Sequence, residues 1–178
     1  GTCGIAHTRW ATHGPPNQLN AHPQTSTDGT IALVHNGIIE NANVIRGQLQ
    51  DEGYAFVSET DTEVVVKLID LLWRKDTLLE DAVTAALRRV EGTYGIAVVS
   101  SRDSDKIVVA RNGSPLLIGV GEEGEVLCGS DAAAVISLTR EVVYLDDGDY
   151  AVLQPSGYRT CHLSGTEVSR SVHQVTWD

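Results

Sequence analysis

The amino-acid sequence predicts a single α+β domain built as a sandwich of two sheets. The second half of the chain is rich in short apolar segments separated by turn-forming residues, a pattern typical of β-strands. The first half contains longer segments with helical periodicity. The 178 residues, 42% of them hydrophobic, are enough for one core and short for two. Strands in the second half are expected at 94–99, 106–110, 116–120, 126–129, 142–145 and 150–153, with a helical patch at 131–138 capped by Ser130.

The chain opens on a segment with an unusual density of reactive side chains. Residues 3–6 are a short apolar piece, and residues 7–13 gather an arginine, an indole, two hydroxyls and two imidazoles. Gly14 and two prolines then force a loop, so we expect a strand that runs into a binding loop. A second apolar run, 31–34, predicts a strand buried on both faces that ends at His35-Asn36-Gly37.

The first predicted helix follows this strand. It begins at Asn41, has Val44, Ile45 and Leu49 on one apolar stripe, and stops at Gly53. A short strand is expected directly after it, at 54–57.

Two further helices are predicted because each apolar run follows the S/T-x-x-E spacing of a capping box. The expected boxes are Thr60 with Glu63, ahead of a helix at 64–73, and Thr77 with Glu80, ahead of a helix at 82–90 that Gly92 ends.

Composition excludes several classes of partner. A net charge of −11 with only 13 Lys plus Arg argues against nucleic acid, which needs a clustered basic face. Cysteines 3, 128 and 161 form no C-x-x-C pair and are odd in number, so we expect neither a disulfide framework nor a zinc knuckle. A reducing, cytoplasmic compartment is expected instead. No segment is long and apolar enough to predict a membrane span. The lack of any Met suggests a piece of a longer chain.

Three patterns look functional but have plainer interpretations. Residues 119–124 match G-x-G-x-x-G, yet a strand follows and two glutamates would face a pyrophosphate, so a hairpin turn is expected. His7, His13 and His22 lack the spacing of a metal site, and no metal is expected. Nothing adjacent in sequence lowers the pKa of Cys3, so we expect a buried strand cysteine and not a nucleophile.

Arg9, the pair Asn36-Gly37 and Asp61 have complementary chemistry. A planar cation suits a carboxylate, an amide with an unobstructed backbone N–H suits a developing oxyanion, and a carboxylate suits an ammonium. An α-amino acid with an amide side chain would use all three. Structural interpretations stay open, because Asn36-Gly37 also fits a tight turn and Asp61 also fits a first-turn acid stabilised by its helix dipole.

Four motifs occur together: GIAHTRWATHG from Gly4, NAHP from Asn20, VHNGIIEN from Val34 and SETDTEV from Ser58. With GSPL and SDAAA further on, they resemble the class-II glutamine amidotransferase (glutaminase) domain of the glutamine:fructose-6-phosphate aminotransferase family. The resemblance implies an N-terminal-nucleophile hydrolase fold, a four-layer αββα sandwich with two antiparallel sheets between helical layers. It implies no cofactor.

The resemblance also implies a reaction and a role for each matched residue. The thiolate of an N-terminal cysteine, with its own α-amine as base, attacks the glutamine carboxamide to give a thioester and ammonia, and water then releases glutamate. The implied roles are carboxylate binding for Arg9, closure of a loop over glutamine for Trp10, Thr12 and His13, the oxyanion hole for Asn36 and Gly37, and ammonium binding for Asp61.

The chain departs from the family pattern at its start, because position 1 is glycine and the HTRW motif follows almost at once. We therefore expect residues 1–178 to be one partial amidotransferase domain, without its N-terminal segment and nucleophile, and inactive by itself; Cys3 is not expected to replace the nucleophile. The expected partners are L-glutamine and the sugar-phosphate isomerase domains of a full-length homo-oligomer that passes ammonia to fructose 6-phosphate. The alternative is an inactive module that binds glutamine or a partner.

Overall fold

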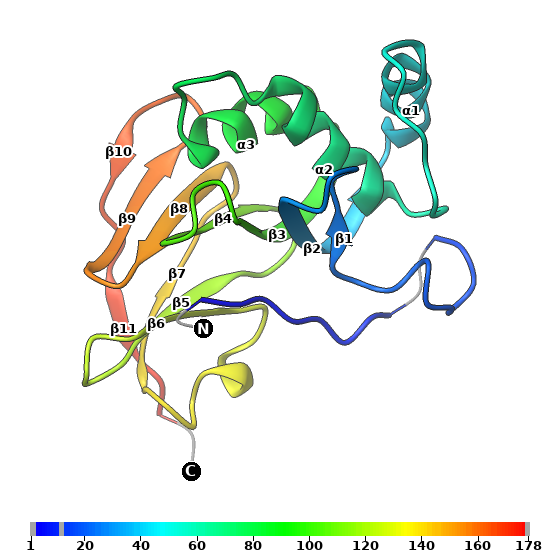
Figure 1. Ribbon diagram of the computed structural model, residues 1–178. Coiled ribbons are helices and arrows are strands. Elements are labelled where there is room, and N and C mark those ends of the chain that lie inside the picture. Colours follow the sequence, from blue (N-terminus) through cyan, green and yellow to red (C-terminus); the bar gives the residue numbers. More distant parts are fainter. Residues whose placement is uncertain (1–2, 11–12, 177–178) are drawn as a thin grey trace.

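The computed structural model describes residues 3–10 and 13–176, which form two antiparallel sheets and three α-helices (Figure 1). The larger sheet has seven strands in the spatial order β1 Gln24–Thr25, β2 Ile31–Ile39, β3 Gly92–Ser100, β4 Ile107–Asn112, β8 Asp149–Gln154, β9 Gly157–His162 and β10 Glu167–Val168. The smaller sheet has four, in the order β11 Val172–Gln174, β7 Glu141–Tyr144, β5 Leu117–Val120 and β6 Val126–Gly129. The helices are α1 Ala42–Asp51, α2 Asp61–Leu72 and α3 Leu79–Leu87.

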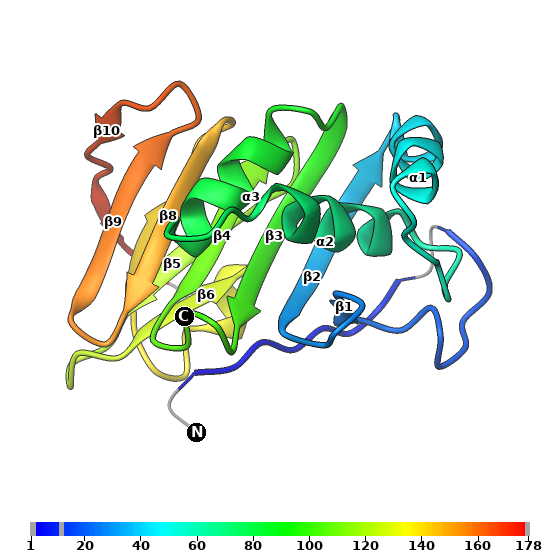
Figure 2. The ribbon, with the colours of Figure 1, turned by 45° about the horizontal axis from the view of Figure 1, so that its top comes forward.

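The helices lie on one face of the larger sheet and the smaller sheet lies on the other (Figures 1 and 2). Side chains of β3 alternate between two apolar clusters, as strand geometry requires. Ile96 and Val98 belong to the cluster that includes Leu68 of α2, whereas Ala97 belongs to the cluster that includes Ile118 of β5. The larger sheet is therefore buried on both faces. This confirms the predicted α+β fold with two antiparallel sheets.

A third, small cluster covers the outer face of the smaller sheet. It joins Leu117 and Val142 to Ala132 and Val135, in and beside the 3-10 helix η1 (Ala132–Ala134). Within the described residues the layers are therefore the three α-helices, the larger sheet, the smaller sheet and, as the fourth layer, this single turn. The longer helix predicted at 131–138 is wrong, and its cap is Asp131 and not Ser130, because the Asp131 carboxylate accepts a hydrogen bond from the Ala133 N–H at 2.8 Å.

All six strands predicted in the second half are present, with shifts of one or two residues at their ends. Four strands were not predicted. β1, β10 and β11 have only two or three residues, and β9 has the mixed sequence GYRTCH. Such segments carry little periodicity of their own, so they become strands only because a neighbour pairs with them.

Two other predicted strands do not form. Residues 3–10 are extended but pair with no strand. Residues 54–57 also pair with no strand, because side chains of α2 bind their backbone. Lys67 donates to the Ala55 carbonyl, and Glu63 accepts from the Val57 N–H at 3.0 Å.

β2 does not end at His35-Asn36-Gly37, as predicted, but continues to Ile39. Gly37 pairs with Tyr94 of β3, so the Asn-Gly pair is not a tight turn. The φ of Gly37 is 125°, and a Cβ there would lie 2.2 Å from the Thr93 carbonyl oxygen. Only glycine permits this approach between the two strands.

The first helix is confirmed, with one error in its apolar stripe. Ile45 and Leu49 of α1 are buried as predicted, whereas Val44 is 63% exposed and Ala42 takes the third buried position. Gly53, which follows the helix, has a positive φ of 92°.

The capping box ahead of α2 is half formed. The Thr60 hydroxyl accepts from the Glu63 N–H at 3.2 Å, but the Glu63 carboxylate accepts from Val57 and Ser58 and not from Thr60. The carboxylate therefore fixes the segment that enters the helix.

The capping box predicted for α3 is wrong. The helix begins at Leu79, and the Asp81 carboxylate accepts from the Leu78 N–H at 3.0 Å. Glu80 is instead buried and pairs with Lys106 at 3.0 Å and Arg159 at 2.7 Å. Among the described helices, none has the length and apolar character needed to cross a membrane.

Candidate functional site

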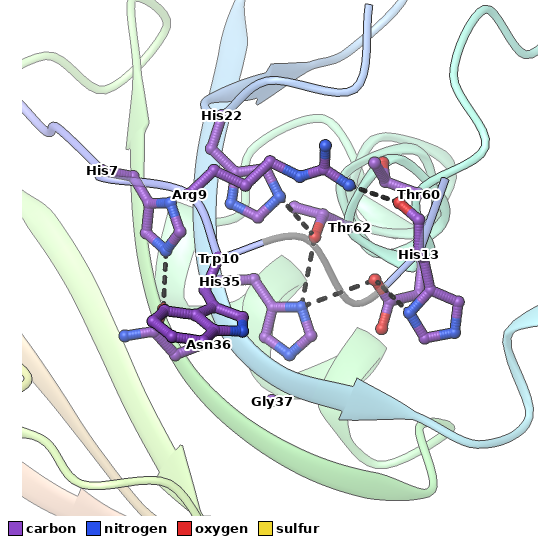
Figure 3. A pocket seen from close by; sticks show the side chains of 11 residues that line it. His7, Arg9, Trp10, His13, His22, His35, Asn36, Gly37, Thr60 and Thr62 are labelled. Carbon is purple, nitrogen blue, oxygen red and sulfur yellow. Dashed lines mark hydrogen bonds and ion pairs between the residues drawn. The ribbon is translucent and has the colours of Figure 1, made fainter. Parts of the chain in front are cut away.

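A cavity of about 260 Å³ lies where the N-terminal segment, β2 and the start of α2 meet (Figure 3). It brings together Arg9, Asn36, Gly37 and Asp61, which are far apart in the sequence. The cavity is lined by His7, Arg9, Trp10, His13, His22, His35, Asn36, Gly37, Thr60, Asp61 and Thr62.

Asn36 and Gly37 lie on a part of β2 with an open edge. β1 pairs only with Ala32 and Leu33, so no strand of the described chain pairs with the rest of β2 on this side. An open edge leaves backbone groups available to a ligand. The Asn36 Oδ1 lies 2.6 Å from the His7 Nε2.

Asp61 is the first residue of α2 and is only 4% exposed. Its Oδ2 accepts a hydrogen bond from the Ile39 N–H at 2.9 Å. Its Oδ1 lies 3.8 Å from the His13 Nδ1 and 3.9 Å from the His35 Nδ1. The helix N-terminus favours a negative charge at this position. One carboxylate oxygen is thus held by the backbone of β2, and the other lies among side chains that line the cavity.

Arg9 binds the loop that follows it. The guanidinium donates to the carbonyls of His13, Gly14 and Pro15, with distances of 3.4 Å to Gly14 and 3.1 Å to Pro15. A guanidinium has five N–H donors, so these bonds leave donors for a ligand. Arg9 therefore shapes the loop and also contributes a cation to the cavity wall.

The residues predicted to close over a ligand are partly described. Trp10 lines the cavity while its side chain is 88% exposed, and His13 contributes its imidazole beside Asp61. Thr12 lies outside the described residues.

Sequence reasoning missed a group of polar residues in the cavity wall. The Thr62 hydroxyl lies 3.1 Å from the His22 Nε2 and 3.2 Å from the His35 Nδ1. Burial, followed by the nearby His7, His35 and Arg9, lowers the pKa of His22 to about 4 against the opposing effect of Asp61. Burial also lowers the pKa of His35. Both imidazoles are therefore neutral at neutral pH. The NAHP and HNG motifs contain these histidines, but no local pattern signals their proximity.

The three cysteines do not line this cavity. Cys3 is exposed, which corrects the prediction of a buried strand cysteine, and it lines a second cavity of about 490 Å³ with Cys128 and Asp105. Partial desolvation of this exposed thiol, followed by the charge of Asp105, raises the pKa of Cys3. Cys128 lines a third cavity, of about 580 Å³, that also reaches Asn36, and burial raises its pKa to about 11. Neither thiol is activated as a nucleophile.

Residues 119–124 belong to the β5–β6 hairpin, as predicted: 119–120 end β5, and the turn follows, with the Gly121 N–H bonded to the Glu125 carbonyl at 2.8 Å. In the described part of the chain, no group of three or more His, Cys, Asp or Glu is arranged to hold a metal ion.

Comparison with known proteins places this chain in a family. Residues 7–137 match the glutamine amidotransferase domain. The chain is 53% identical over 176 residues to the glutamine–fructose-6-phosphate aminotransferase (isomerizing) of Chlorobaculum tepidum, covering 98% of this chain and 28% of that protein. It is 49% identical over 177 residues to the enzyme of the same name from Methanothermobacter thermautotrophicus, covering 99% of this chain and 30% of that protein.

A solved structure has the same fold. The glutamine phosphoribosylpyrophosphate amidotransferase of B. subtilis, complexed with ADP and GMP, superposes with a TM-score of 0.71 at 25% identity, covering 88% of this chain and 34% of that one.

The chain spans about three tenths of the length of these aminotransferases. No comparison favours an inactive binding module over an amidotransferase. Because the family match extends over well more than half of the sequence and includes the residues around the cavity, the chain belongs to the glutamine amidotransferase domain family.

Proposed function

We propose that this chain binds L-glutamine in the cavity between Arg9 and Asp61 and forms the glutaminase part of an enzyme that releases ammonia from the glutamine side chain. The observation that carries the proposal is the convergence of a cation, an open strand edge at Asn36-Gly37 and a buried carboxylate around one small cavity. Each group matches one part of glutamine.

Charge and geometry support an orientation for the substrate. The Asp61 Oδ1 attracts the α-ammonium and the Arg9 guanidinium attracts the α-carboxylate. The side-chain amide then extends toward β2, where the Asn36 amide and the Gly37 backbone N–H stabilise the oxyanion that forms when a nucleophile attacks. Trp10, Thr12 and His13 close over the bound amino acid.

The names of the relatives support a wider role. We propose that the full-length protein passes the ammonia to fructose 6-phosphate, and that its further partners are sugar-phosphate isomerase domains in a cytoplasmic homo-oligomer. Residues 1–178 act as one partial amidotransferase domain within that protein. The nucleophile is a thiol other than Cys3, since Cys3 lies at a different cavity and its pKa is raised.

The assignment of Asp61 tests the proposed binding mode. In the full-length protein, Asp61→Asn is expected to raise the KM for L-glutamine by roughly 10-fold or more, because a charged hydrogen bond to the ammonium is lost. Competition by glutaramate, which has the amide and carboxylate but no α-ammonium, should change little. The measurement is glutamate release at varied concentrations of both compounds.

Asp70→Asn is the matched control, since Asp70 lies on the same helix outside the cavity lining and accepts from the Tyr54 hydroxyl. An Asp61→Asn variant that loses affinity for both compounds equally, or for neither, would remove Asp61 from the ammonium site.

A further inference from the structure

His7 touches the side chain that the proposed reaction depends on. Its Nε2 lies 2.6 Å from the Asn36 Oδ1, and both residues line two adjoining cavities (Figure 3). A carboxamide can rotate by 180° and exchange its oxygen for its NH₂ group. Whatever binds the oxygen therefore decides where the two N–H donors point.

The neighbouring contacts fix the tautomers of two imidazoles beside His7. The His35 Nε2 lies 3.2 Å from the Thr93 carbonyl oxygen, which only accepts, so the neutral His35 carries its proton on Nε2. Its bare Nδ1 then accepts from the Thr62 hydroxyl at 3.2 Å. Because the Thr62 proton is used there, the Thr62 oxygen accepts from the His22 Nε2–H at 3.1 Å.

His22 in turn supports the His7 ring. The two ring centroids are 4.5 Å apart with an interplanar angle of 38°. The Nδ1 atoms of both rings are buried without a hydrogen-bond partner in the described part of the chain, so each ring makes its polar contact through Nε2 alone. His7 therefore has one hydrogen bond to make, and Asn36 receives it.

The Asn36 amide nitrogen makes no hydrogen bond within the described residues. With Oδ1 held by the His7 Nε2–H, rotation of the amide would bring two donors together, which is unfavourable. We propose that His7 is a positioning residue that locks the Asn36 carboxamide with its N–H donors turned toward the reacting amide. This inference rests on the proposed function, because it gives Asn36 the task of binding an oxyanion.

A double-mutant cycle in the full-length protein tests this. Asn36→Ala is expected to lower kcat by roughly 10²–10³ with little change in KM for glutamine, since it removes one preorganised donor. His7→Ala should lower kcat by about 10-fold, again with little change in KM, because the donor remains but is no longer held in one orientation. In the Asn36→Ala background, His7→Ala should change kcat by less than about 2-fold.

His7→Gln supplies an amide N–H near the position of Nε2 and should recover most of the lost kcat. His173→Ala removes an exposed histidine of β11 that lines neither cavity, and should leave kcat unchanged. Circular dichroism and the Tm of each variant report whether it is folded.

The outcomes separate the two claims. The inference fails while the proposed function stands if Asn36→Ala lowers kcat and His7→Ala does not. It also fails if folded His7→Ala causes the same loss of kcat in the wild-type and the Asn36→Ala backgrounds, because His7 then does not act through Asn36. If Asn36→Ala leaves kcat unchanged, the oxyanion role fails and the inference fails with it.

Discussion

Among single residues, Arg9 combines two tasks that need the same planar group. Its guanidinium donates to three consecutive carbonyls of the loop that follows it, and it also lines the cavity that Asp61 lines. A lysine ammonium has the charge but not the fork of donors. In the proposed binding mode the loop and the substrate share this side chain, and a guanidinium has enough donors for both.

Replacing Arg9 by lysine is expected to raise the KM for glutamine by roughly 10-fold or more in the full-length protein, because a point charge cannot make a bidentate contact with a carboxylate. Steady-state glutaminase kinetics measure this. Arg89→Lys serves as control, since Arg89 is bonded to Gln48 on the protein surface. Unchanged glutamine kinetics in Arg9→Lys would exclude Arg9 from the substrate site.

Among the elements, the N-terminus of α2 organises the site. The Thr60 hydroxyl caps the helix, Asp61 bonds the backbone of β2, and the Thr62 hydroxyl bonds His22 of the preceding loop. That loop is also tied down by Asn20, which is 2% exposed and accepts from the Glu59 N–H at 2.9 Å. The helix start thus joins a strand and a loop that are distant in the sequence.

This arrangement predicts a loss of stability in acid. Below pH 6.5 the unfolded chain binds a proton on His22, whereas the folded chain binds it only near pH 4. The unfolded state therefore binds more protons between these values, and the free energy of unfolding falls as the pH falls through this window. The lowered pKa of His35 acts in the same direction. Thermal unfolding should show a lower Tm at pH 5 than at pH 7.

The variant His22→Gln, which cannot be protonated, should show a smaller fall in Tm between pH 7 and pH 5. His173→Gln should keep the full fall, because His173 is exposed on β11. Equal falls in all three proteins would show that His22 is not held neutral by the fold.

In the whole molecule, none of the three cysteines lines the cavity that Arg9, Asn36 and Asp61 share. Cys3 lines the cavity beside β6, and Cys128, which shares a cavity with Asn36, is half-buried, with its pKa raised by desolvation to about 11. A thiol needs a lowered pKa to act as a nucleophile at neutral pH. Neither Cys3 nor Cys128 is therefore activated as a nucleophile.

We expect the 178-residue chain to release no ammonia from L-glutamine, and Cys3→Ala to leave the glutaminase rate of the full-length protein unchanged. A coupled assay for ammonia, with circular dichroism to verify folding, measures both. Ammonia release by the 178-residue chain that disappears in Cys3→Ala would instead identify Cys3 as the nucleophile.

Local sequence patterns were enough to predict the six strands of the second half and the positions of three helices, because periodicity and turn residues are read from neighbours in the chain. They failed where a long-range contact replaced the local one. Glu80 fits a capping box by spacing, yet it pairs with Lys106 and Arg159 in the fold. Asn36-Gly37 fits a tight turn, yet pairing with β3 keeps it in a strand.

The sequence by itself determined the chemistry of the site, since the types of residue at Arg9, Asn36-Gly37 and Asp61 already match the parts of an amide-bearing amino acid. Only the tertiary structure decided how these groups are held. The contact from His7 to Asn36 spans 29 residues and that from His22 to Thr62 spans 40. Such contacts depend on which strands pair and which loop packs on α2, and hydrogen-bond direction depends on the partners that surround each ring. No pattern within a few residues contains that information.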